Sequence, residues 1–257
     1  MFDVFISQGK ILQELGGTVS VVLLVFSRCI AFTSTAPFIG SKQIPTLAKI
    51  SFAMVLTLLI VPVIEVPSEY PRNYKFIYLI IMNVMVGLLI GWVATLVTEL
   101  ARVAGEMLNM QMALNAATIF DPSAQTQTAI VGHLFNSLAM IIFITVGGME
   151  KAIEAVLKSF QTFPVLIYEF TFNFDKLLKA TADVFFIGYL IVSPIIVVIL
   201  VMDLILGLMS RAAPQINAFQ ISFSIKPTIG LVLFLILLPA MMEILVKIFS
   251  DPTRFFY

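Results

Sequence analysis

Long apolar blocks separated by short polar connections dominate the chain. The cleanest blocks cover residues 76–98 and 184–202, and each is long enough to cross about 30 Å of hydrocarbon as a helix. A third apolar helix is predicted from about Ile130 to the glycine pair Gly147 and Gly148. Shorter or interrupted blocks lie at 15–40, 50–64 and 227–242. The pattern predicts an all-α, polytopic integral membrane protein of about six hydrophobic helices, some of them short or broken.

The short blocks and the connections between them shape the expected architecture. Apolar blocks shorter than a bilayer span are expected to be tilted, to be re-entrant or to cover other protein subunits. Turn signals at 41–45 and 66–71 predict connections, and a longer mixed-charge connection is expected from Glu150 to Asp183. No internal repeat is evident, so residues 1–257 are expected to form one membrane-embedded domain. If six helices alternate, the Lys and Arg distribution favours cytoplasmic termini.

Composition confirms the membrane class and excludes several activities. Hydrophobic residues make up 60% of the chain and charged residues 12%, which is about half the charged fraction of a soluble domain. A formal net charge of +0 gives no electrostatic case for nucleic acid as a partner. The single cysteine, Cys29, and the single histidine, His133, cannot build a metal site of their own kind. Phosphate-binding and nucleophile motifs are missing from the sequence, so we expect no catalytic residue, no metal, no cofactor and no enzymatic activity.

Charged residues inside apolar blocks need a partner or a watery surface, because an ionised group at mid-membrane costs about 2.5–3.5 kcal/mol. Arg28 and Asp203 are the clearest examples. They belong either to an ion or proton pathway or to polar locks between helices or subunits, and one group of each sign favours the locks. Glu243 and Lys247 have the spacing of an ion pair at a helix end.

Small residues and a polar interruption mark two further features. Gly87 and Gly91 form a G-x-x-x-G pattern, which predicts a close approach of another helix. The stretch 105–122 alternates methionines with amides inside an otherwise apolar protein, and it cannot face lipid without partners. It is either ordinary core packing or a closed plug, and the buried amides favour the plug. The Asp121–Pro122 step is expected to end it.

Taken together, several stretches carry a resemblance that covers nearly the whole chain. They are Arg28 with Pro37-Phe38-Ile39-Gly40, Ile44-Pro45 and Lys49; Gly87 with Gly91; residues 105–122; and Asp203 to Phe219 followed by Lys226. In order and spacing they resemble the FliR family of flagellar export-gate proteins, whose relatives serve in the type III secretion systems of virulence injectisomes. The last stretch is the most specific of the four.

The resemblance implies a subunit of the bacterial inner membrane, located in the flagellar basal body. It would assemble with FliP and FliQ, next to FlhB and near FlhA, into a gate through which unfolded flagellar proteins are secreted. The implied plug residues are Gly105, Met107, Met110, Gln111, Met112, Asn115, Phe120, Asp121 and Pro122. The residues expected to act in assembly or intramembrane pairing are Arg28, Gly87, Gly91, Asp203, Arg211, Pro214, Gln215 and Asn217.

Three other readings of the sequence remain open at this point. The chain resembles the flagellar branch more closely than the injectisome branch, but both use a similar phrase around residues 211–217. A secondary transporter for a small solute would place its binding site in the polar interruption, although such transporters usually show related halves. A structural scaffold would nucleate assembly without gating. For Arg211, Gln215 and Asn217, the alternative to binding FliP or FliQ is that they cap the end of the preceding helix.

Overall fold

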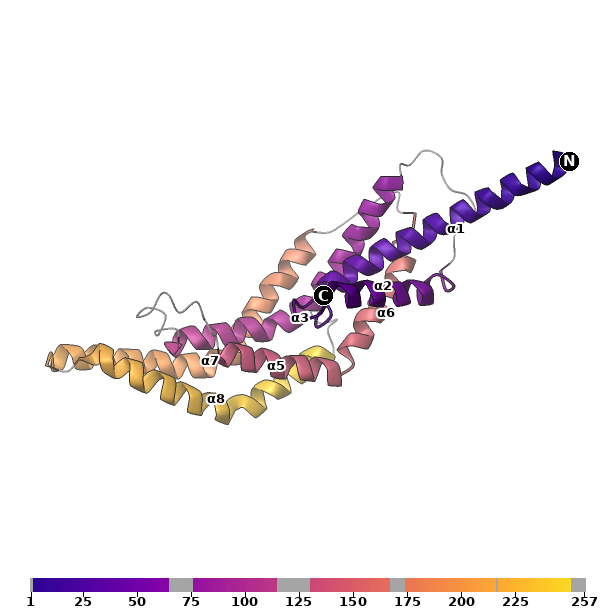
Figure 1. Cartoon of the computed structure of the whole chain (residues 1–257). Helices are drawn as coiled ribbons and strands as arrows, with labels where there is room; N and C mark the ends of the chain where they lie inside the picture. Colours follow the sequence, from indigo (N-terminus) through magenta and orange to yellow (C-terminus); the bar gives the residue numbers. More distant parts are fainter. Residues whose placement is uncertain (1, 65–75, 115–129, 167–173, 216, 251–257) are drawn as a thin grey trace. The chain divides into compact units, whose positions relative to one another are not determined.

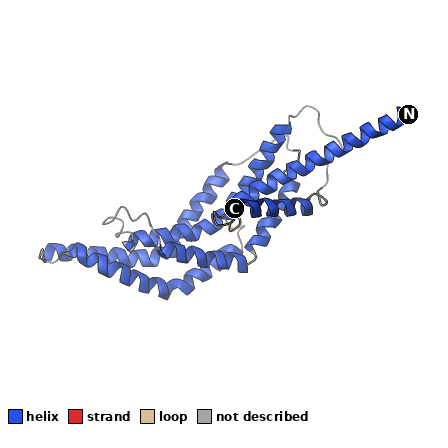
Figure 2. Ribbon diagram, viewed as in Figure 1, coloured by secondary structure: helices blue, strands red, loops and turns tan. Residues whose placement is uncertain are grey.

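The computed structural model describes residues 2–64, 76–114, 130–166, 174–215 and 217–250. Throughout these ranges the regular structure is helical, as Figure 2 shows, which confirms the predicted all-α class. In chain order the helices are α1 (Phe2–Thr35), α2 (Thr46–Ile60), α3 (Phe76–Gln111), α5 (Ile130–Thr145), α6 (Gly148–Thr162), α7 (Phe174–Ala212) and α8 (Ala218–Ser250), labelled in Figure 1.

Three segments of the described chain are long and apolar enough to cross a membrane. They are Phe76–Leu96, Leu177–Ala212 and Ala218–Ser250, and a fourth is reached if the broken pair α5 and α6 counts as one span. The break follows the predicted glycine pair, since Gly147 has a φ of 75° that ordinary side chains rarely adopt. The chain is therefore a polytopic membrane protein, as its composition predicts.

Three helices differ from the prediction. The mixed-charge connection expected from Glu150 to Asp183 is wrong at both ends, because α7 already begins at Phe174 and α6 runs through the first part as far as Thr162. That helix buries Ala152, Val156 and Phe160 at a spacing of four residues, while the outward-facing pair Glu154 and Lys158 is joined at 2.6 Å. Likewise, α8 begins nine residues before Pro227 and contains both Pro227 and Pro239. The helix is therefore about twice as long as the apolar block expected at 227–242.

The chain divides into two compact units. The first comprises Met1–Thr95 with Met149–Phe172, and the second comprises Leu96–Gly148 with Asn173–Tyr257. The division falls within α3, so this helix takes part in both units. The single membrane-embedded subunit predicted for residues 1–257 stays a prediction.

In the first unit, α1 packs closely on α2 and on the first half of α3. Its core includes Leu24, Val25, Cys29 and Phe32 of α1, Ala53, Leu56 and Ile60 of α2, Leu79 of α3, and Val156 and Phe160 of α6. The predicted close approach at Gly87 and Gly91 is confirmed: a Cβ at either glycine would collide with the backbone of α1, at Arg28 and Phe32 respectively.

In the second unit, the second half of α3 contacts α5 and α7, and Met112, which follows it, contacts α8. Two edge-to-face aromatic pairs join α5 to α8, Phe135 with Phe234 at 6.0 Å and Phe143 with Phe249 at 5.8 Å between ring centroids. A Cβ added at Gly188 of α7 would lie 3.3 Å from the Leu100 carbonyl of α3. Small residues and aromatic contacts therefore set the packing of this unit.

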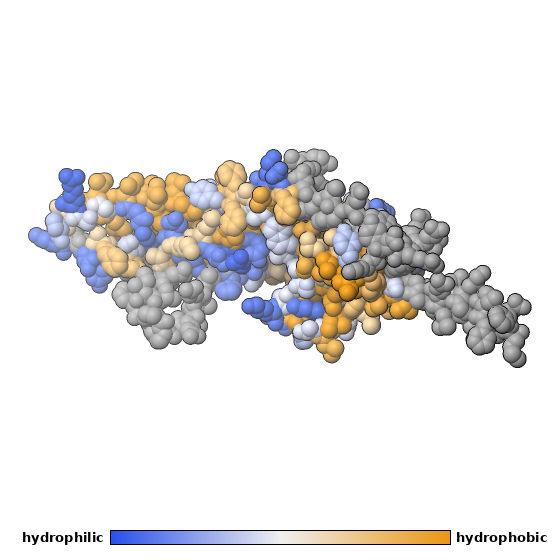
Figure 3. All heavy atoms as spheres, turned by 90° about the horizontal axis from the view of Figure 1, so that it is seen from above, coloured by the Kyte–Doolittle hydropathy of each residue, from blue (hydrophilic) through white to orange (hydrophobic). Residues whose placement is uncertain are grey.

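Large apolar side chains remain uncovered, especially on α7 and α8. Figure 3 shows extensive hydrophobic areas on the visible face, interrupted by hydrophilic ones. On α7, Leu200, Leu204 and Leu208 recur at a spacing of four and are each more than half exposed. A continuous apolar stripe of this kind needs lipid or another protein as its neighbour.

Candidate functional site

The stretch predicted to form a plug begins as a helix. Gly105 to Gln111 are the last turns of α3, so the helix predicted to end near Thr98 continues to the middle of the polar interruption. The predicted plug residues Asn115, Phe120, Asp121 and Pro122 lie outside the described residues. We call the described residues 105–112 the base of the plug stretch.

The base is held against the start of α5 by a close backbone contact. A Cβ at Gly105 would lie 2.5 Å from the Cα of Gly132, so no larger residue fits here without moving one of the helices. One turn later, the fully buried Asn109 accepts a hydrogen bond at 3.3 Å through its Oδ1 from the Val131 backbone N–H. This N–H belongs to the first turn of α5, where no carbonyl of the helix itself can serve it.

Asn109 also carries an unused donor. Its buried Nδ2 group has no hydrogen-bond partner among the described residues. Burying an amide donor without a partner costs about 1–3 kcal/mol, so this position is held by the rest of the packing rather than by the amide itself.

The three methionines of the stretch have different surroundings. Met112 is fully buried, and its side chain fills the space over Gly230 of α8, where an added Cβ would lie 2.5 Å from the methionine Cγ. Met107 is half-buried, whereas Met110 is 70% exposed. The neighbouring Gln111 is also exposed. Among the described plug residues, therefore, Met112 anchors the base and Met110 is free to contact something else.

The helix ends with an unusual turn. Ala113 adopts a φ of 56°, the left-handed conformation that usually requires glycine at the end of a helix. Its N–H donates to the Met110 carbonyl at 3.1 Å, and the Met112 N–H donates to the Leu108 carbonyl at 2.9 Å. An alanine in this conformation is strained by about 1–2 kcal/mol, which the surrounding contacts must offset.

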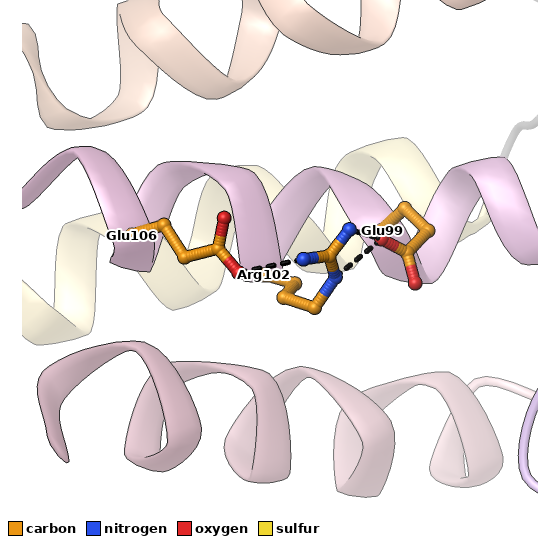
Figure 4. A network of polar contacts seen from close by, with 3 residues as sticks. All are labelled: Glu99, Arg102 and Glu106. Atoms are coloured by element: carbon orange, nitrogen blue, oxygen red, sulfur yellow. Dashed lines mark hydrogen bonds and ion pairs between the residues drawn. The ribbon is translucent and has the colours of Figure 1, made fainter. Parts of the chain in front are cut away.

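Three charged residues at the start of the plug stretch and just before it were not singled out from the sequence. Glu99, Arg102 and Glu106 form one network along α3, drawn in Figure 4. The Arg102 guanidinium donates to Glu106 at 2.6 Å and to Glu99 on its other side. Hydrogen bonding to Glu99 and the charges of both carboxylates raise the pKa of Arg102 above its ordinary value. The spacing i, i+3, i+7 was the available signal.

A second polar site lies in the first unit, around Arg28. The buried guanidinium donates from Nε and Nη2 to Asn83 Oδ1 at 3.0 and 2.7 Å, and from Nη1 to Ser159 Oγ at 3.1 Å. It also lies 3.9 Å from the centroid of the Phe160 ring. Asn83 in turn donates through Nδ2 to the carbonyls of Leu79 and Val165. Arg28 thus joins α1, α3 and α6 through neutral groups.

The other predicted pairing residues lie along α7 and α8. Asp203 forms an ion pair with Lys226, which joins the two helices. The predicted pair of Glu243 and Lys247 is confirmed at 2.7 Å. Both ion pairs therefore lie within the hairpin that α7 and α8 form.

The turn between α7 and α8 contains the remaining four. Arg211 lies in the last turn of α7, Pro214 and Gln215 follow the helix, and all three are exposed. Asn217 Oδ1 accepts a hydrogen bond at 3.2 Å from the Gln220 backbone N–H. It therefore caps the start of α8 rather than the end of α7, and the capping alternative is wrong in direction for this residue. Pro214, Gln215 and Asn217 also line an open hollow at this turn.

Within the described ranges, no group of three His, Cys, Asp or Glu side chains is placed to hold a metal ion. The Arg28 site consists of hydrogen bonds between helices, whereas the network of Arg102 lies within α3 alone.

Comparison with known proteins identifies the family. Residues 19–251 match the family described as "Bacterial export proteins, family 1". The flagellar biosynthetic protein FliR of Buchnera aphidicola subsp. Acyrthosiphon pisum (strain APS) is 31% identical over 225 residues, which cover 87% of each chain. FliR of Escherichia coli (strain K12) is 28% identical over 87% of this chain and 86% of its own. FliR of Bacillus subtilis (strain 168) is 24% identical over 89% and 90%.

These matches span both compact units, including the base of the plug stretch, the Arg28 site and the α7–α8 hairpin. The relatives take part in flagellar biosynthesis and the family in protein export, so the chain is an export component and not an enzyme. The chain belongs to the FliR family of bacterial export proteins.

Proposed function

We propose that this chain is a subunit of the flagellar type III export gate in the bacterial inner membrane, at the flagellar basal body. It assembles with FliP and FliQ, beside FlhB and FlhA, and unfolded flagellar proteins pass through the assembly. The family match over residues 19–251 and the flagellar names of the relatives support this role over the injectisome. The uncovered apolar stripe on α7 supports a larger assembly or a lipid neighbour.

The observation that carries the gating part is the contrast between a fixed base and an exposed methionine. Gly105, Asn109 and Met112 are held by α5 and α8, while Met110 projects from the same turns. A segment that must seal a channel and later withdraw needs both a firm attachment and soft apolar side chains outside it.

In this mechanism the closed gate is sealed by Met110 together with Phe120, and the stretch withdraws when a substrate and the energised export machinery engage it. Met107 and Met112 contribute less directly, since the first is half-buried and the second is packed on Gly230. Arg28 and Asp203 act as polar locks within the chain, and Arg211 and Gln215 are free to contact FliP or FliQ.

The assembly is tested by the native mass of the complex recovered with a tagged copy of this chain, expressed with and without FliP and FliQ. A defined hetero-oligomer that forms only with both partners is expected. A stable particle of this chain alone, which ignores both partners, would contradict the proposal and favour the secondary transporter.

The plug is tested by ion leakage across the membrane in the assembled complex. Deleting residues 115–122 removes predicted plug residues without touching the packed base, and we expect increased leakage. A deletion from Met107 to Ala116 would also remove Asn109 and Met112, and any leakage could then reflect lost packing. Unchanged leakage from the shorter deletion, in a complex of normal mass, would leave a scaffold without gating as the better account.

A further inference from the structure

The second half of α3 has a charged face and a core face on opposite sides. Glu99, Arg102 and Glu106 share one side of the helix, and Met110 continues it by one more turn. We name the three charged residues the charged face. The opposite side is fully buried and carries Leu100, Ala101, Ala104 and Leu108. The charged face therefore leads along the helix to the exposed methionine of the plug stretch.

The charges of this face satisfy one another. Arg102 uses Nε and Nη2 on Glu99 and Nη1 on Glu106, so its guanidinium serves both carboxylates, as Figure 4 shows. All three side chains stay at least one-third exposed. With one guanidinium and two carboxylates the network keeps a formal net charge of −1, and it presents charged atoms to whatever lies beside it.

Two environments suit such a face poorly. Against lipid each charge would cost about 2.5–3.5 kcal/mol near the bilayer centre. At the centre of a subunit interface, three charges would lose their water, and charged residues are depleted there. A water-filled cavity is the environment in which membrane proteins usually place such residues.

We propose that the charged face lines the aqueous path of the assembled gate and is passed by the unfolded polypeptide during export. This inference rests on the proposed export function. An extended chain in transit presents charges of both signs and free backbone groups, and a wall whose charges are largely paired, with a net charge of only −1, offers it polar contacts without a strong net attraction. Weak contacts of this kind let a passing molecule leave as well as enter.

Cysteine accessibility tests the proposal. Cys29, the only cysteine of the chain, is buried and can be replaced by alanine to give a cysteine-free background. In that background Glu106→Cys probes the charged face, and Ala104→Cys, two residues away on the buried side, is the matched control. Glu99→Cys probes the same face and leaves the pair of Arg102 and Glu106 intact, should Glu106→Cys prevent assembly.

The probe is a membrane-impermeant methanethiosulfonate reagent that carries a trimethylammonium group, applied to cells and to inverted vesicles containing the assembled complex. We expect the thiol on the charged face to react at least about tenfold faster than Ala104→Cys, because reaction requires an exposed thiolate in water. An export substrate fused to a stably folded domain, and thereby arrested in the gate, should slow this reaction by at least about tenfold.

Two results would overturn the inference. Slow reaction in the assembled complex but fast reaction without FliP and FliQ would show that a partner subunit covers the face. Fast reaction that the arrested substrate does not change would place the face in water but away from the path. The native mass of the same samples separates this from the proposed function: without a hetero-oligomer the export assignment itself fails, whereas an unreactive face in an intact complex rejects only the inference.

Discussion

The two halves of α3 use polar residues in opposite ways. The first half buries a neutral amide, Asn83, which receives the hydrogen bonds of the buried Arg28. The second half exposes Arg102, which is paired with two carboxylates on its own helix. One arginine thus joins segments that are distant in sequence, and the other is satisfied locally and adds little to the packing.

This difference shows what burial does to the role of a charge. A buried guanidinium must have its donors satisfied by the fold, so its loss disturbs every segment that it touches. An exposed guanidinium is largely solvated, and its removal costs little stability but changes the surface that other molecules meet. Substitutions along and beside α3 should therefore separate effects on folding from effects on export.

The largest effect is expected at Arg28. Arg28→Met leaves Asn83 and Ser159 without their buried donor, and the free energy of unfolding should fall by about 3–5 kcal/mol. The measurement is the apparent melting temperature of the detergent-purified complex, together with the amount of chain that accumulates in membranes.

A double substitution provides the control for Arg28. In Arg28→Met with Asn83→Leu, the amide oxygen is no longer left unsatisfied, but the Val165 carbonyl loses its Asn83 donor, so only about 1 kcal/mol or less should be recovered. If the single Arg28→Met variant melts like the wild type, the buried network does not stabilise the first unit.

The next effect is expected at Gly105, where the second half of α3 meets α5. Gly105→Ala places a methyl group against Gly132 and should destabilise the protein by about 1–3 kcal/mol. Gly207→Ala is the matched control, since its added Cβ meets nothing within 4 Å in this chain and a helical alanine can add up to about 1 kcal/mol. Equal melting temperatures for the two variants would argue against the close contact at the base.

A smaller and stabilising effect is expected where α3 ends. Ala113→Gly should raise the free energy of unfolding by about 0.5–1 kcal/mol, because glycine adopts a φ of 56° without a Cβ penalty. Ala113→Val should lower it, since a β-branched residue fits this conformation worse still. Thermal melting of the purified complex measures both, and a lower stability of the glycine variant would count against the strained turn.

The smallest effect on stability is expected at Arg102. Arg102→Met repeats the substitution made at Arg28, but it removes only exposed ion pairs and should cost about 1 kcal/mol or less. The melting temperatures of Arg28→Met and Arg102→Met, measured side by side, test the comparison directly. A loss at Arg102 as large as that at Arg28 would mean that the charged face supports the fold rather than a surface.

Parts of this arrangement could be predicted from the sequence. Gly87 and Gly91 predicted a close helix contact, and Arg28 stood out because a charge inside an apolar block needs partners. The partners themselves could not be predicted, since Asn83 and Ser159 are 55 and 131 residues away from Arg28. The charged face had a visible spacing of i, i+3 and i+7, but its exposure depends on which side of α3 the other helices cover.

By itself the sequence determined the class of the protein and the positions of most helices, because hydropathy and helical periodicity are local properties of the chain. Only the tertiary structure decided that Met112 is buried under α8 while Met110 is exposed, and that Asn109 serves the first turn of α5. Such roles depend on contacts between distant segments. Two methionines two residues apart are chemically alike, and only the helices packed around them give them different surroundings.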